Sequence, residues 1–175
     1  LCIQTLSFTS AAAALADPEP VFSASDMTFS SGTDAVALPQ SAVTQLSGLS
    51  SGTIIVDFTP TAMSTANCLF ILSNSSVTDA YFNLYIDNRG FLGLEVRNHG
   101  ETRYVNLQGP AEVTRNTRHI MALSADPQEG YKFYFDGDMV FQMPVALYEL
   151  WEYDYRFMST VNSADVGYMG ATYRN

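Results

Sequence analysis

Several residue types are scarce in this chain of 175 residues. It has two cysteines, too few for a disulfide framework, and it lacks the Cys-x-x-Cys and His/Cys clusters of zinc sites. Lys and Arg together number 8 against 18 Asp and Glu, and this net charge of −10 argues against nucleic-acid or anionic-membrane binding. The sequence also lacks an apolar run long enough to span a membrane. An anionic ligand would therefore have to be bound by a few locally placed arginines.

The plentiful residues are those of a β-protein. Hydrophobic residues make up 47% of the chain and aromatic residues 13%, which indicates a globular fold of single-domain size. Strand-like segments such as Thr53–Thr59, Cys68–Leu72 and Tyr131–Asp136 are separated by short turns, and only Val145–Tyr155 suggests a short helix. The pattern predicts an all-β fold, a jelly-roll sandwich of two antiparallel sheets. Its expected core residues are Ile55, Phe70, Phe82, Leu84, Leu94, Val96 and Phe133.

A central hairpin allows the strand register to be predicted. Apolar and polar residues alternate along Tyr81–Asp87 and along Phe91–Asn98. A three-residue loop, Asn88–Gly90, pairs Asn83 with Glu95 and keeps the apolar faces together, whereas a two-residue turn would set them against each other. The three-residue loop is the consistent choice. It gathers five side chains on one polar face: Tyr81, Asn83, Tyr85, Glu95 and Arg97.

Two interpretations of this polar face remain open. It can be a solvated sheet face with an ordinary cross-strand charge pair, which contributes at most about 1 kcal/mol. It can also be a sugar site, in which Glu95 holds Arg97 or accepts sugar hydroxyls. The guanidinium fork matches a carboxylate in a way that a lysine cannot.

Four segments, in this order, resemble the family 40 carbohydrate-binding modules of sialidases and intramolecular trans-sialidases. They are Thr53–Thr59, Tyr81–Asn98, Gly130–Asp138 and Gly170–Arg174. The resemblance implies a concanavalin-like jelly roll, related to laminin-G-like sandwiches, that binds terminal sialic acid and carries no catalytic residues. It also implies a secreted or cell-surface protein with sialylated glycans as partners. The module would direct an attached sialidase catalytic domain to sialylated mucin or cell-surface glycans.

The resemblance further implies which residues bind the ligand. Carried over by position, Arg97 and Arg174 would clamp the sialate carboxylate. Glu95 would orient them and bond the amino-sugar portion, and Tyr85 would line the site. Because both arginines are expected on an exposed face, removing either should barely change stability.

The first residues allow two interpretations. Residues 1–20 are either a closing strand of the sandwich or the remnant of a leader peptide, with the binding domain over 21–175. Family members continue past the second arginine with a loop and a closing strand, whereas this sequence ends at Asn175. Ile3–Phe8 resembles that strand and would fill its place, by circular permutation or by pairing between molecules. We therefore expect Leu1–Phe8 to form a strand of the sandwich.

Two rival functions are weighed. A laminin-G-like module that binds protein or calcium is the alternative, and structural calcium is the one cofactor left open. Oxygen ligands for calcium could come from Asp79, Asp87, Asp136 and Asp138. An autonomous glycosidase is disfavoured, because Glu149, Glu152 and Asp154 lack the spacing of acids on one inward-facing strand.

Overall fold

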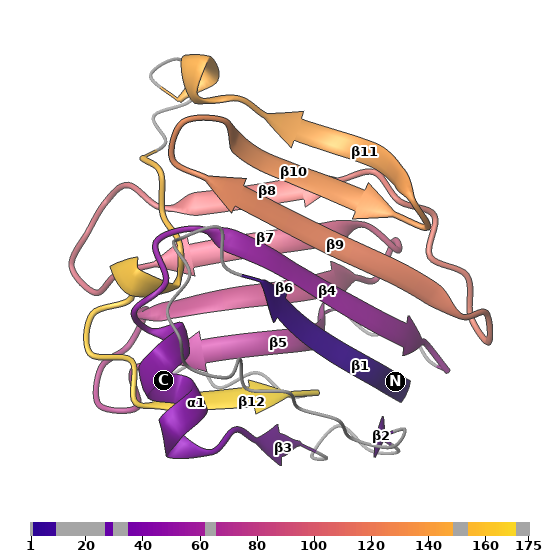
Figure 1. Ribbon diagram of the computed structural model, residues 1–175, viewed down its shortest axis with the longest axis horizontal. Helices are drawn as coiled ribbons and strands as arrows, with labels where there is room; N and C mark the ends of the chain where they lie inside the picture. Colours follow the sequence, from indigo (N-terminus) through magenta and orange to yellow (C-terminus); the bar gives the residue numbers. More distant parts are fainter. Residues whose placement is uncertain (1, 10–26, 30–34, 62–65, 149–153, 171–175) are drawn as a thin grey trace.

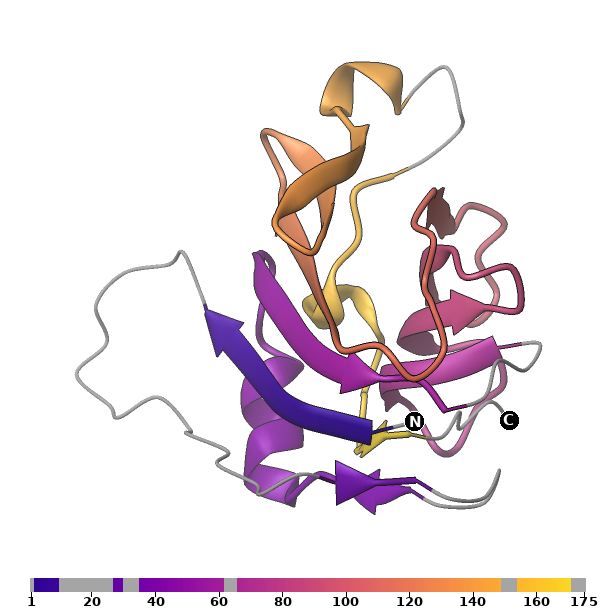
Figure 2. The same ribbon diagram turned by 90° about the vertical axis from the view of Figure 1, so that its right-hand side faces the viewer.

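The computed structural model describes residues 2–9, 27–29, 35–61, 66–148 and 154–170, with backbone alone for β1, β2 and residue 66. Two six-stranded antiparallel sheets face each other (Figures 1 and 2). The first sheet has the order β11 (Asp138–Met143), β10 (Gly130–Phe135), β9 (His119–Asp126), β4 (Gly52–Thr59), β1 (Cys2–Thr9) and β2 (Met27–Thr28). The second has the order β3 (Val36–Ala37), β12 (Val166–Met169), β5 (Ala66–Ser73), β6 (Tyr81–Asp87), β7 (Leu92–Arg97) and β8 (Val105–Gly109). The prediction of a two-sheet sandwich is confirmed.

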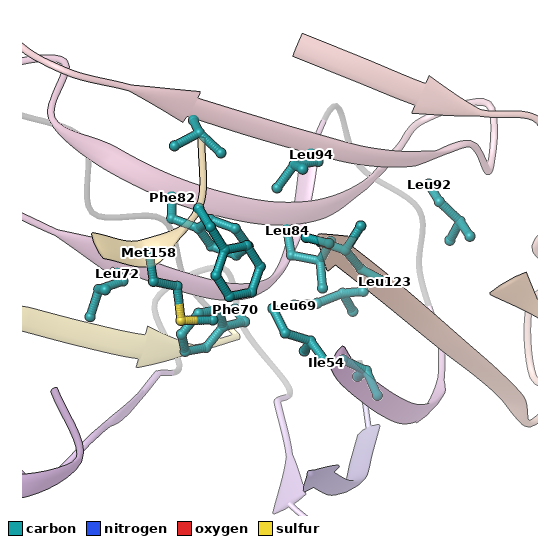
Figure 3. Packing of buried hydrophobic residues seen from close by; sticks show 14 of the residues in the cluster. Ile54, Leu69, Phe70, Leu72, Phe82, Leu84, Leu92, Leu94, Leu123 and Met158 are labelled. Atoms are coloured by element: carbon teal, nitrogen blue, oxygen red, sulfur yellow. The ribbon is translucent and has the colours of Figure 1, made fainter. Parts of the chain in front are cut away.

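The core lies between the two sheets, where aromatic and branched side chains interdigitate (Figure 3). Six of the seven expected core residues are completely buried: Phe70, Phe82, Leu84, Leu94, Val96 and Phe133. Ile55 is the exception and the prediction for it is wrong. Burial alternates along β4, so Ile54 and Val56 face inward while Ile55 lies on the outer face, half-buried.

The helices of the described residues are short. The α-helix α1 (Gln40–Leu46) begins after Pro39 and buries Ala42, Val43 and Leu46. The sequence analysis missed it, although a proline followed by apolar residues at helical spacing is a recognised helix signal. Two 3₁₀ turns, η1 (Val145–Leu147) and η2 (Met158–Thr160), complete the helical content of the described residues. Within those residues, no helix is long and apolar enough to cross a membrane.

The opening segment lies inside the first sheet. Strand β1 pairs antiparallel with β4, from Cys2 opposite Thr59 to Thr9 opposite Thr53, and its other edge pairs with β2. The expected strand over Leu1–Phe8 therefore corresponds to β1. The division of the chain at residue 20 falls outside the described residues and stays a prediction.

The central hairpin has the predicted register. Ile86 pairs with Leu92 and Asn83 pairs with Glu95 along β6 and β7. The Asp87 N–H donates to the Phe91 carbonyl, which leaves Asn88–Gly90 as the loop. Gly90 has φ of +87°, a left-handed conformation that glycine adopts without strain. This register fixes which side chains share the outer face of the second sheet.

Candidate functional site

The outer face of the second sheet carries the five polar residues that the hairpin pattern placed together. Four of them are buried, however: Tyr81 is 2% exposed, Asn83 0%, Tyr85 8% and Glu95 6%. A second apolar cluster also lies on this face, in which Tyr81 packs against Cys68 and Ile71. The interpretation of this face as an ordinary solvated surface is therefore wrong.

Glu95 and Arg97 form the central ion pair of this face. The Arg97 Nε–H donates to Glu95 Oε1 at 2.6 Å, and the two side chains are 29% and 9% exposed respectively. Burial acts to lower the pKa of Arg97, but the Glu95 carboxylate together with Tyr81 and Tyr104 outweighs it, so that pKa lies above its ordinary value. The guanidinium is therefore permanently charged. No other hydrogen bond of Arg97 is formed within the described residues, so its terminal nitrogens have no partner there.

The Tyr104 ring also contacts the Arg97 guanidinium. The Arg97 Cζ lies 3.9 Å from the centre of the Tyr104 ring, a cation–π contact. The sequence analysis missed this residue. Pairing of Val96 with Val105 places Tyr104 opposite Arg97, so the signal was available only once the β7–β8 register was known. Glu95 and Tyr104 together fix the guanidinium in one orientation.

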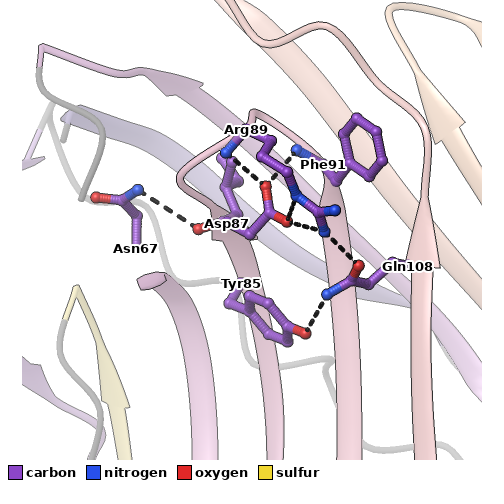
Figure 4. Close-up of polar contacts among 7 residues, drawn as sticks. Asn67, Tyr85, Asp87, Arg89, Phe91 and Gln108 are labelled. Carbon is purple, nitrogen blue, oxygen red and sulfur yellow. Dashed lines mark hydrogen bonds and ion pairs between the residues drawn. The ribbon is translucent and has the colours of Figure 1, made fainter. Parts of the chain in front are cut away.

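Tyr85 lies across the neighbouring position of the sheet. It pairs with Gly93, and a Cβ added to Gly93 would overlap the Tyr85 ring, so the ring rests on bare backbone. The Tyr85 hydroxyl accepts a hydrogen bond from Gln108 Nε2 at 3.4 Å (Figure 4). Tyr85 is thus an aromatic side chain held against the sheet, and its role in a sugar site stays a prediction.

A second carboxylate–arginine pair closes the hairpin loop. Asp87 Oδ1 accepts from the backbone N–H groups of Arg89 and Phe91, and Oδ2 accepts from Arg89 Nε at 2.8 Å and Nη2 at 2.5 Å (Figure 4). The same Nη2 donates to Gln108. Burial alone would raise the pKa of Asp87, but these hydrogen bonds and the arginine charge hold it below its usual value. The Asp87 carboxylate therefore stabilises the hairpin turn.

The candidate calcium ligands do not form a cluster among the described residues. In the parts of the chain that the structure describes, no three His, Cys, Asp or Glu side chains lie close enough to hold a metal ion. Asp136, another candidate, accepts from the His119 ring at 2.8 Å and from the Ile120 N–H. That histidine also accepts from the Thr114 N–H, and its ring centre lies 6.0 Å from that of Phe58 and 4.8 Å from that of Phe135. The hydrogen bonds of His119 and Asp136 join β9 to the turn after β10, and both ring nitrogens of His119 are used in them.

Two groups of expected residues lie outside the described residues. Arg174, the second arginine of the expected clamp, is one of them, so its approach to Arg97 stays a prediction. Glu149 and Glu152 of the disfavoured glycosidase reading are the others. Asp154 is described and is about half exposed beside Arg103.

Comparison with known proteins identifies the family. Residues 27–175 match the family model "Sialidase, N-terminal domain". No curated protein matches the sequence. The Ruminococcus gnavus IT-sialidase CBM40 bound to alpha2,3 sialyllactose is 26% identical, with a TM-score of 0.65 over 75% of this chain and 69% of that chain. This comparison confirms the resemblance to the family 40 modules.

Two whole sialidases share the fold. The leech intramolecular trans-sialidase is 20% identical with a TM-score of 0.71, over 98% of this chain and 23% of that one. The NanB sialidase from Streptococcus pneumoniae is 22% identical with a TM-score of 0.68, over 81% and 21%. This chain thus corresponds to less than a quarter of either enzyme. On its sequence match and its two-sheet fold, the chain belongs to the family of sialidase N-terminal domains, and is a sialidase-related carbohydrate-binding β-sandwich.

Proposed function

We propose that this domain binds the terminal sialic acid of glycans without catalysing a reaction, and that Arg97, Glu95, Tyr85 and Arg174 form the site. It would act outside the cell, where it would hold an attached sialidase on sialylated surfaces. The R. gnavus modules bound to alpha2,3 and alpha2,6 sialyllactose support the ligand class. The proposal needs no cofactor.

The geometry of Arg97 is the observation that carries the proposal. Its Nε is bonded to a buried carboxylate and its plane rests on Tyr104, while its terminal nitrogens make no hydrogen bond within the described residues. A guanidinium held in this way loses little entropy when a carboxylate binds. The chain has a net charge of −10, so this fixed guanidinium is a local positive charge in an acidic protein, as the binding of an anionic sugar requires.

The chemistry of sialic acid fits the neighbours of Arg97. The sugar carboxylate would accept two charge-assisted bonds from the terminal nitrogens, and Arg174 would add a second guanidinium. Glu95 would keep Arg97 in place and accept from the amino-sugar portion. The Tyr85 ring would line the sugar ring, since aromatic side chains provide flat apolar contact with a polar end.

Calorimetry with 3′-sialyllactose tests the proposal. Arg97→Lys keeps the charge beside Glu95 but removes the fork, so binding should weaken by about tenfold or more, since each charge-assisted bond contributes about 1.5–3 kcal/mol. Arg174→Ala should have an effect of similar size. The matched control is Arg118→Lys, because Arg118 also pairs with an acid, Asp57 on β4 of the other sheet, and has no expected role in the site. Wild-type protein that does not bind sialyllactose, or arginine variants that bind like it, would overturn the assignment.

The targeting role has a separate test. The domain fused to a fluorescent protein should bind cells or mucin that carry sialic acid, and binding should be lost after the glycans are treated with an unrelated sialidase. Arg97→Lys in the same fusion should bind no better than the desialylated control. Equal binding before and after desialylation would exclude targeting through sialic acid.

A further inference from the structure

One buried side chain on the proposed ligand face has no hydrogen-bond partner. Asn83 is 0% exposed, and neither its Oδ1 nor its Nδ2 forms a hydrogen bond. More than nine in ten buried polar groups in proteins are bonded, because an unpaired buried amide is costly. Two other buried asparagines in the described part of the chain follow that rule. Asn74 donates to the Asn162 carbonyl and accepts from the Ser76 N–H, and Asn98 accepts from the Asn162 N–H.

Strand register places this amide inside the proposed site. Asn83 on β6 lies opposite Glu95 on β7 and opposite Ile71 on β5. Arg97 is opposite Tyr81, two residues before Asn83, so Arg97 and Asn83 are diagonal neighbours on one face. Such neighbours have Cα atoms about 7–8 Å apart, close enough for a single sugar residue to contact both side chains.

We propose that Asn83 is a specificity-determining residue of this site, whose amide pairs with two neighbouring hydroxyl groups of the ligand, those of the glycerol side chain of sialic acid. The inference rests on the proposed function. A primary amide presents a donor and an acceptor side by side, and a vicinal diol offers the complementary acceptor and donor. The acetamido group cannot satisfy both atoms, because its N–H and C=O point in opposite directions.

The positions of the two groups in the sugar agree with the sheet. The carboxylate and the glycerol side chain of sialic acid are attached on either side of the ring oxygen. A carboxylate on Arg97 therefore brings the glycerol hydroxyls to the neighbouring positions of the same face. Asn83 occupies such a position. Buried strand positions are usually filled by apolar residues, so an asparagine here needs an explanation.

Access to the amide requires a side chain to turn aside. The Tyr85 ring rests on Gly93 and reaches towards Gln108, so it stays in place to line the sugar. The side chain that turns aside would be another neighbour of Asn83 on this face, such as Tyr81, which lies opposite Arg97. The diol then reaches Asn83 directly or through one bridging water, which is nearly as favourable as a direct hydrogen bond.

The test combines two ligands with two proteins. Mild periodate oxidation followed by borohydride reduction shortens the glycerol side chain of 3′-sialyllactose and removes its terminal diol. Wild-type protein should bind the shortened ligand about tenfold more weakly than the intact one. Asn83→Leu should bind both ligands equally, at the wild-type affinity for the shortened form. This loss of discrimination measures the coupling between Asn83 and the diol.

Thermal unfolding supplies a second readout that a structural role would not give. Replacing an unpaired buried amide by an isosteric apolar group should raise the Tm of Asn83→Leu by about 2–4 °C. The control Asn74→Leu breaks real hydrogen bonds, so it should lower the Tm while leaving ligand discrimination intact. If Asn83→Leu folds poorly, Asn83→Ala serves for the ligand comparison.

The possible negative results distinguish the proposed function from the proposed role of Asn83. Wild-type protein that binds neither ligand overturns the proposed function, and the role of Asn83 with it. Wild-type protein that binds both ligands equally well overturns the inference alone. So does an Asn83→Leu variant that still discriminates between the ligands, or one whose Tm falls as that of Asn74→Leu does.

Discussion

Two carboxylate–arginine pairs on the second sheet share the same spacing but differ in how completely they are bonded. Asp87 and Arg89 close the hairpin loop, and the Asp87 carboxylate accepts four hydrogen bonds from two residues. Glu95 and Arg97 lie on the strand that follows and share one bond through Nε. Arg89 is 57% exposed but bonded through Nε and Nη2, whereas Arg97 is 29% exposed with its terminal nitrogens unbonded in the described part.

The difference separates a structural pair from a binding pair. Two backbone N–H groups and the Arg89 guanidinium together occupy both oxygens of Asp87, so that pair holds a turn and its carboxylate has no acceptor left for a ligand. The Glu95 pair uses a strand side chain to fix an arginine whose terminal nitrogens form no hydrogen bond within the described residues. Identical Asp/Glu-x-Arg spacing therefore carries no functional meaning until the remaining partners of each group are known. The following predictions test the contrast between the two pairs.

Removing the acid of the turn should have the largest effect on stability. Asp87→Ala leaves the N–H groups of Arg89 and Phe91 without their acceptor, which should cost about 2–3 kcal/mol. Urea unfolding measures this loss. Sialyllactose affinity, measured on the folded fraction, should stay close to wild type. A variant of unchanged stability would show that the turn does not depend on this carboxylate.

Adding one methyl group beside the binding pair should affect ligand binding more than stability. The Cβ in Gly93→Ala occupies space now filled by the Tyr85 ring, which must turn away from the sheet. We expect a stability loss of about 1–2 kcal/mol and severalfold weaker glycan binding. Gly100→Ala is the control for substituting an open loop glycine, since its added Cβ meets no atom, although its positive φ adds strain. Unchanged sialyllactose binding by Gly93→Ala would remove Tyr85 from the site.

Loss of the aromatic support of Arg97 should have a smaller effect. Tyr104→Leu keeps apolar contact but removes the cation–π attraction, which contributes about 0.5–1 kcal/mol at a partly exposed position. Sialyllactose affinity should fall by a few-fold in calorimetry. The matched change at the other pair is Phe91→Leu, since Arg89 lies 4.6 Å from the Phe91 ring. That variant should bind like wild type, and equal losses in both would contradict the proposed division of roles.

The smallest expected effect is a dependence on acid pH. The folded protein holds the pKa of Asp87 below its unfolded value of about 3.9, so it binds fewer protons there than the unfolded chain does. The stability from this group is therefore present above pH 4 or so and is lost as the pH falls toward the folded pKa. Unfolding at pH 5 and pH 3 should show a shallower loss for Asp87→Asn than for wild type. Equal slopes would mean that Asp87 does not contribute.

The burial of Glu95 changes what we expect for the stability of a variant that lacks Arg97. The expectation that its removal barely affects stability assumed an exposed charge, but its partner Glu95 is buried. Removing Arg97 takes away one partner of a buried carboxylate, which costs more than the loss of a surface pair. For this reason the binding test uses Arg97→Lys, which keeps a cation in place.

The sequence alone determined the sandwich fold, the register of the hairpin and the face on which Glu95 and Arg97 lie. These follow from local rules: side chains alternate along a strand, and a left-handed glycine sets the length of a loop. It could not choose between two adjacent isoleucines on β4, because Ile54 and Ile55 are equally apolar and only the opposing sheet decides which one faces inward.

Only the tertiary structure decided what the outer face of the second sheet is. Asn83 lies opposite Ile71 of β5 and Glu95 lies opposite Asn106 of β8, and the contact of Tyr104 with Arg97 also joins neighbouring strands of this sheet. Alternation can say that a side chain is not in the core, but it cannot say what covers it. That is why a face that reads as solvated contains a fixed arginine and an unpaired amide, the two groups on which binding is proposed to depend.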